Sequence, residues 1–113
     1  MDATSQSGGE PITSRAQLVE YLEGGCKPKD QWRIGTEHEK FAYDLSTFSR
    51  LNYDGTPGIA ALLEGLMRFG WEPVREGKNV IALRKPDGAS VSLEPGGQFE
   101  LSGAMLETIH QTC

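Results

Sequence analysis

The residues SVSLEPGGQFELS, numbers 90–102, contain two short alternating runs separated by a proline and two glycines. In the first run Val91 and Leu93 alternate with polar residues, and in the second Phe99 and Leu101 do the same. Successive side chains of a strand point to opposite faces, so each run predicts a strand with one apolar and one polar face. The proline and the glycines predict a tight turn between the two strands.

Two further strands are predicted upstream of this pair, one at residues 80–84 and one within residues 32–43. Residues 80–84 and 89–94 flank Pro-Asp-Gly at 86–88, where proline fixes φ and glycine tolerates a positive φ, so these segments predict a hairpin. With the strand that ends at Ser102 they form a three-stranded antiparallel meander. Residues 32–43 also alternate, which predicts a separate strand with one charged face.

Two internal segments have the signals of helices. Ser14 and Gln17 have the spacing of a capping box, which predicts a short helix ended by the glycines after Glu23. Thr56 as a cap and Pro57 at the first helical position predict a second helix, ended by a glycine at position 70. The apolar stripe of this second helix consists of Ile59, Leu62, Leu63, Leu66 and Met67.

Together these elements predict an α+β fold, an antiparallel sheet with helices on one face, because the apolar strand faces need a covering layer. A last helix is predicted from Ala104 onward, and its apolar stripe is unfinished at Cys113, which indicates part of a larger protein. The Ser- and Gly-rich residues 1–10 predict a flexible N-terminus. One domain, residues 11–113, accounts for the rest of the 113-residue chain.

Composition excludes several classes of function. Sixteen acidic and eleven basic residues leave a formal charge of -5, which argues against a nucleic-acid partner. No apolar run approaches the length of about 18 residues needed to span a membrane. The first ten residues resemble neither a secretory signal nor a transit peptide, so a cytoplasmic location is expected. Cys26 and Cys113 lack the spacing of a zinc site and are expected to be reduced thiols.

The polar strand faces concentrate carboxylates. Residues two apart on a strand stand roughly 6.5 to 7 Å apart, so Glu37 and Glu39 are spaced to hold one cation or two neighbouring ones. Oxygen-only ligands favour a hard cation such as magnesium. Alternatively, the same spacing describes a solvated outer face, which is the commoner meaning of Glu-x-Glu, and the residues alone leave both readings open. The predicted polar face collects Glu37, Glu39, Glu94, Gln98 and Glu100.

Two longer motifs resemble the glutamate-cysteine ligases of the plant and proteobacterial type. They are RIGTEHEKF at residues 33–41 and SLEPGGQFELSG at 92–103, supported by GCKP at 25–28 and LETIHQTC at 106–113. The resemblance implies part of a glutamine synthetase-like catalytic fold, in which residues 11–113 are the N-terminal part of the catalytic domain. Within that family, Glu37, Glu39, Glu94 and Glu100 correspond to metal ligands and Gln98 to a substrate-binding residue.

The resemblance also implies an activity. It is the ATP-dependent ligation of the glutamate side-chain carboxyl to the cysteine amine, which gives γ-glutamylcysteine through a glutamyl phosphate, as the first step of glutathione biosynthesis. The implied partners are glutamate, cysteine, ATP and Mg²⁺, and a homodimer of the full-length enzyme is allowed. The 113-residue chain alone is expected to be inactive. The alternatives are a related carboxylate-amine ligase with a different amine, or a non-catalytic binding module.

Overall fold

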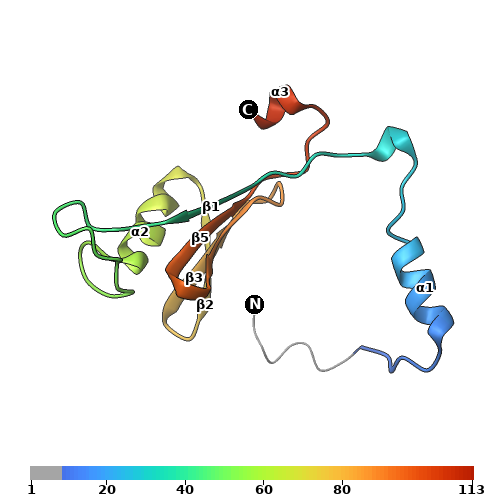
Figure 1. Cartoon of the computed structure of the whole chain (residues 1–113), viewed down its shortest axis with the longest axis horizontal. Coiled ribbons are helices and arrows are strands. Elements are labelled where there is room, and N and C mark those ends of the chain that lie inside the picture. Colours follow the sequence, from blue (N-terminus) through green and yellow to red (C-terminus); the bar gives the residue numbers. More distant parts are fainter. Residues whose placement is uncertain (1–8) are drawn as a thin grey trace. The chain divides into compact units, whose positions relative to one another are not determined.

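The computed structural model describes residues 9–113, which fall into two compact units, one up to residue 33 and one from 34 to 113. The larger unit contains a five-stranded sheet in the order β1-β5-β4-β3-β2, and all neighbouring strands are antiparallel (Figure 1). The fold class is therefore α+β, as predicted. The strands are β1 (Glu37–Phe41), β2 (Glu72–Glu76), β3 (Asn79–Arg84), β4 (Ser90–Glu94) and β5 (Gln98–Ser102).

The predicted meander is confirmed as β3, β4 and β5. Between β3 and β4, the Lys85 amide donates to the Ala89 carbonyl over 2.8 Å, and the Ala89 amide donates to Oδ1 of Asp87 over 2.9 Å. Gly88 has a φ of 93°, a conformation that is unfavourable for any residue with a Cβ atom. The local sequence therefore determines this turn, and β5 has the predicted bounds.

Strand β2 was missed by the sequence analysis. It pairs only with β3 among the described residues, so it is an edge strand of this sheet, and its ladder is irregular between Val74 and Arg75. Pro73 lies inside it, and proline is tolerated in a strand mainly at a sheet edge. A proline and three charged residues in five positions hide the alternation that identifies the other strands.

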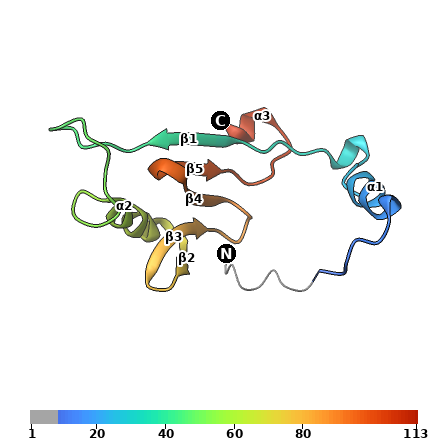
Figure 2. The same ribbon diagram turned by 60° about the horizontal axis from the view of Figure 1, so that its bottom comes forward.

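The core of the larger unit lies between the sheet and helix α2 (Ile59–Leu66). Ile59 and Leu63 of the helix are buried, and Figure 2 shows α2 lying beside β3. Leu66 and Met67 of the predicted stripe pack at the margin of this core. One helix, rather than several, thus covers the apolar face within residues 34–113. The buried hydrophobic cluster consists of Ile59, Leu63, Val80, Leu83 and Val91.

Helix α2 begins later than predicted. Gly58, not Thr56, is the N-cap residue, and Pro57 precedes the helix. The first helical amides donate to main-chain carbonyls of the preceding loop: Ile59 to Asn52 over 2.9 Å, and the next residue to Tyr53 over 3.0 Å. Because these carbonyls satisfy the helix start, no side-chain cap is needed. The predicted end is confirmed, through a 3-10 turn η2 (Met67–Phe69) and a glycine in the left-handed region.

The first strand and the last helix are both shorter than predicted. Strand β1 spans five residues, and Ile34 lies outside it in an isolated bridge to Leu106. The two residues exchange main-chain hydrogen bonds of 2.7 and 2.9 Å, which draws Leu106 away from a helix. Helix α3 (Ile109–Thr112) therefore begins after Thr108 rather than at Ala104, with Thr108 as its cap.

The smaller unit contains helix α1 (Arg15–Glu23) and a 3-10 turn η1 (Lys29–Gln31). The capping box of Ser14 and Gln17 is present, and Gly24 is the C-cap, as predicted. The prediction of a flexible segment at residues 1–10 falls mostly outside the described residues. Among those described, no helix is long and apolar enough to cross a membrane.

Candidate functional site: the carboxylate face of the sheet

The five predicted site residues share one face of the sheet. In the β1–β5 ladder Glu39 is opposite Glu100, and in the β5–β4 ladder Gln98 is opposite Glu94. Directly opposed residues of antiparallel strands point to the same side. Glu37 lies two residues before Glu39 on β1 and therefore points the same way. The register confirms the predicted common face, which is hereafter called the carboxylate face.

This face is organised as three rows that run across β1, β5 and β4. Neighbouring rows are two residues apart along each strand, a separation of roughly 6.5 to 7 Å. The helix α2 covers the opposite face, so the rows face away from the core. The rows are Phe41, Gln98 and Glu94; then Glu39, Glu100 and Ser92; then Glu37, Ser102 and Ser90.

The central row contains two opposed carboxylates. Glu39 and Glu100 are direct cross-strand partners, a relation that places Cβ atoms about 4.5 to 5.5 Å apart. Like charges on directly opposed residues destabilise a sheet, and a cation bound by both carboxylates would reverse the effect. Glu39 is exposed and Glu100 is half-buried. The Ser102 hydroxyl donates to Oε1 of Glu100 over 3.1 Å, which leaves the second oxygen available.

The Glu94 carboxylate is also oriented by a serine, which lies in the neighbouring row. The Ser92 hydroxyl donates to Oε1 of Glu94 over 2.7 Å, and both residues are half-buried. Gln98, opposite Glu94, is also half-buried and contributes a neutral amide with both donor and acceptor groups. This end of the carboxylate face therefore combines one carboxylate with one amide, and no buried side-chain polar atom among the described residues lacks a hydrogen bond.

Two glycines determine how β4 and β5 meet. The turn η3 (Pro95–Gly97) contains Gly96 with φ of 78° and Gly97 with φ of 79°, both in the left-handed region. A Cβ at Gly97 would lie 3.4 Å from Cδ1 of Ile59 in the core. The turn thus returns the chain while keeping Glu94 and Gln98 opposed.

The donor set of this face suits a hard cation, because it offers carboxylate and hydroxyl oxygens and neither sulfur nor imidazole. In the part of the chain that the structure describes, however, no three Asp, Glu, His or Cys side chains are grouped so that they could hold one metal ion. The structure brings Glu39 and Glu100 together as a pair and leaves Glu37 and Glu94 in separate rows. Metal binding remains a prediction.

The serines of the carboxylate face were missed by the sequence analysis as site residues. Ser92 and Ser102 each donate to a carboxylate two residues away on their own strand. The signal was present in the sequence, since a Ser-x-Glu or Glu-x-Ser spacing on a strand places both side chains on one face. These hydroxyls orient carboxylates that the charge pattern alone had identified.

Several known proteins that are similar in sequence to this chain share one name. The chain is 57% identical over 105 residues to chloroplastic glutamate-cysteine ligases of Arabidopsis thaliana and Nicotiana tabacum, and 55% identical over 105 residues to that of Medicago truncatula. The alignments cover 92% of this chain and 19 to 20% of each relative. The chain therefore spans about a fifth of the length of the curated relatives it matches.

These relatives correct one prediction. The expected cytoplasmic location is contradicted, because the matching ligases are named as chloroplastic. The expectation depended on the composition of the first ten residues.

A family model described as glutamate-cysteine ligase family 2 matches residues 33–113. The matched region includes all five strands and every residue of the carboxylate face. It also contains both long motifs on which the resemblance was based. The chain belongs to glutamate-cysteine ligase family 2.

Proposed function

We propose that the chain is part of an enzyme that joins the glutamate side-chain carboxyl to the cysteine amine at the expense of ATP, the first step of glutathione synthesis. The single observation that supports this most directly is the carboxylate face, because the two family motifs contain β1, β5 and most of β4. Its sheet, apolar on one side and acidic on the other, suits the wall of a glutamine synthetase-like catalytic fold.

In this proposal Glu39 and Glu100 form the centre of a magnesium site, with Glu37 and Glu94 as further ligands in the adjacent rows. A bound magnesium ion supplies charge neutralisation for phosphate oxygens during phosphoryl transfer. Ser102 holds one oxygen of Glu100, so that the other is directed toward a ligand. The hydrogen bond from Ser102 restricts the carboxylate before the ion binds, so less conformational freedom is lost on binding.

Gln98 has the chemistry to contact a substrate rather than a metal. Its amide can donate to a carboxylate or phosphate oxygen and accept from an ammonium group, and it is half-buried beside Glu94. The proposed reaction proceeds by attack of the glutamate side-chain carboxylate on the terminal phosphate of ATP, followed by displacement of phosphate by the cysteine amine. The remaining four-fifths of the family's chain supplies the other groups, and a homodimer of that longer protein stays a prediction.

The experiment is a magnesium titration of turnover in the full-length enzyme. Glu37→Gln and Glu100→Gln should each abolish most γ-glutamylcysteine formation, because glutamine keeps the volume but lacks the negative charge that a divalent ion needs. Glu72→Gln is the matched control, since Glu72 lies on the outer strand β2. Circular dichroism checks folding. Near-normal turnover in both test variants would contradict the metal assignment.

The same assay separates the alternatives. Turnover with another amine and none with cysteine would support a related carboxylate-amine ligase. Absence of ATP consumption with every amine would support a non-catalytic binding module. The 113-residue chain by itself is expected to be inactive, because it carries only one wall of the proposed site.

A further inference from the structure

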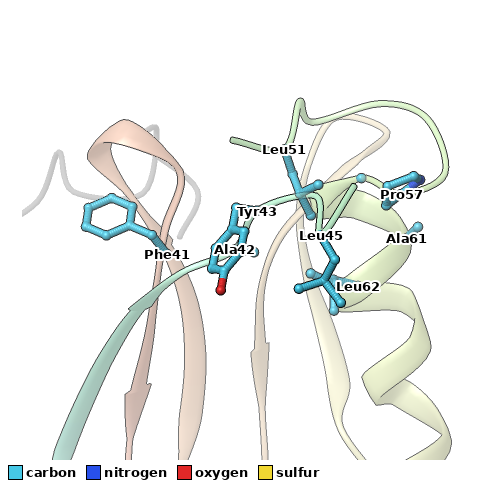
Figure 3. A pocket seen from close by; sticks show the side chains of 9 residues that line it. Phe41, Ala42, Tyr43, Leu45, Leu51, Pro57, Ala61 and Leu62 are labelled. Atoms are coloured by element: carbon cyan, nitrogen blue, oxygen red, sulfur yellow. The ribbon is translucent and has the colours of Figure 1, made fainter. Parts of the chain in front are cut away.

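A groove of about 580 Å³ lies where the chain leaves β1 and returns to the start of α2 (Figure 3). None of its nine lining residues carries a charge, and the Tyr43 hydroxyl is its one polar side-chain group. Figure 3 shows Leu45 beside Leu62 of α2, with Pro57 and Leu51 nearby. A lining of this kind does not suit ATP or an amino acid, whose charges need partners, and it suits another apolar surface.

The side chains around this groove are exposed to an unusual degree. Leu45 is 78% exposed, Phe41 65% and Tyr43 53%. Phe48, next to the groove, is 76% exposed and stacks on Tyr43 with ring centroids 6.1 Å apart. Contiguous apolar surface of this kind on a soluble protein typically marks a place where another segment or protein packs.

The loop that carries these residues is held in a defined conformation. The Asp44 amide donates to the Ser49 carbonyl, and the Phe48 amide donates to the Asp44 carbonyl, each over 2.8 Å. The Asp44 carboxylate also accepts from the hydroxyl and the amide of Ser46, and these hydrogen bonds hold its pKa below the usual value. Phe48 adopts a φ of 57°, a strained conformation for a bulky residue. This local structure keeps apolar side chains out in solvent.

The strand that precedes the groove has an unpaired edge within the described residues. Within the described residues β1 pairs only with β5, so its second edge has no strand beside it. Beyond Phe41 the chain folds back on itself at the groove, with Tyr43 bridged to Arg50 and the Leu51 amide donating to the Ala42 carbonyl over 3.4 Å, so the unpaired edge is limited to β1 itself. An unpaired strand edge beside an apolar groove is suited to an added strand with a following apolar side chain.

We propose that this groove is the docking site of a segment of the same polypeptide, one that follows Cys113 in the full-length family protein. The relatives are about five times as long as their aligned segments, so most of the surface that can cover this groove lies outside the 113 residues. The proposal rests on the prediction that residues 11–113 are the N-terminal part of the catalytic domain, which would put that polypeptide beyond residue 113. The occupant is an apolar strand or turn without charges at its contact residues.

The test is the labelling rate of single cysteines in the full-length protein, in which Cys26 and Cys113 are first replaced by serine because both are exposed thiols. Leu45→Cys and Leu62→Cys report on the groove. Lys78→Cys, in the exposed turn between β2 and β3, is the matched control. At every protein concentration, maleimide should label the two groove thiols at least about tenfold more slowly than the control, and equally fast after denaturation.

Equal native rates would overturn the proposal. Protection that disappears on dilution would overturn it in favour of a second copy, and protection seen only with an added ligand would overturn it in favour of that ligand. A stop codon directly after Cys113 in the gene would also overturn the proposal. If a cysteine variant misfolds, hydroxyl-radical oxidation of the unaltered protein gives the same answer, with slow oxidation of Leu45 and Phe48 expected. Neither readout depends on ligase turnover.

Discussion

The two faces of the sheet differ in burial although the same strands form both. Between α2 and the sheet, Leu83 and Val80 of β3 are 0% and 1% exposed, and Leu63 of the helix is 0% exposed. On the carboxylate face, Glu39 is exposed and Glu100 is half-buried. An antiparallel sheet can pack one face and leave the other to solvent, so stability and chemistry are assigned to different sides of one structure.

The register of the strands connects the two faces. A slip of one residue in β5 would turn Glu100 toward α2 and Leu101 toward the carboxylate face. Burial of a carboxylate beside Leu63 would be strongly unfavourable, because the charge would have no partner there. The apolar core therefore also holds the carboxylates in their rows.

The largest effect is expected from the core itself. Leu63→Ala should lower the free energy of unfolding by about 2–5 kcal/mol, because it removes a fully buried side chain and leaves a cavity. Leu62→Ala, at a neighbouring position that is 43% exposed, should cost clearly less. Urea unfolding followed by circular dichroism measures both. Equal losses would contradict the assignment of the core to the α2 side.

The start of α2 should be nearly as sensitive. A Cβ at Gly58 would lie 2.5 Å from the Gly55 carbonyl oxygen and 3.0 Å from that of Asp54. Gly58→Ala should therefore cost about 1–3 kcal/mol through main-chain displacement. Gly65→Ala in the same helix meets nothing within 4 Å and should stabilise it by up to about 1 kcal/mol. The comparison of thermal midpoints tests this, and similar behaviour of the two variants would count against the packed helix start.

The carboxylate face should respond in the opposite sense. With metal removed by a chelator, Glu39→Gln should raise the free energy of unfolding by up to about 1 kcal/mol, because it relieves repulsion from the opposed Glu100. Added Mg²⁺ should stabilise the unaltered protein and leave the variant nearly unchanged, since only the former keeps the carboxylate pair. Urea midpoints with chelator and with Mg²⁺ measure this. An identical response to Mg²⁺ in both proteins would remove the support for a paired metal site.

The smallest effect is expected at the other edge of the same sheet. Nε of Arg84 lies 3.7 Å from Oε2 of Glu72, and both side chains are largely exposed. Glu72→Gln should change the free energy of unfolding by no more than about 0.5 kcal/mol, because solvent screens an exposed ion pair. Its urea midpoint should also be insensitive to Mg²⁺. A larger or magnesium-dependent change would show that the response is not specific to the opposed glutamates.

Local signals in the sequence predicted much of this arrangement. Three features depend on residues close together in the chain: the capping box of α1, the turn between β3 and β4, and the bounds of β5. They could therefore be predicted without knowledge of the tertiary structure. The start of α2 and the start of α3 were placed wrongly for the converse reason. In both, main-chain partners from a distant or preceding loop, such as Ile34 for Leu106, determine where the helix can begin.

The sequence by itself determined which side chains share a face, because the two-residue period of a strand sorts Glu37 and Glu39 from their neighbours without any knowledge of the partner strand. Only the tertiary structure decided that Glu39 is opposite Glu100, that β2 extends the sheet, and that one helix covers its apolar face within residues 34–113. Pairing between segments far apart in the chain depends on how the apolar faces pack together, and that packing is a property of the whole unit.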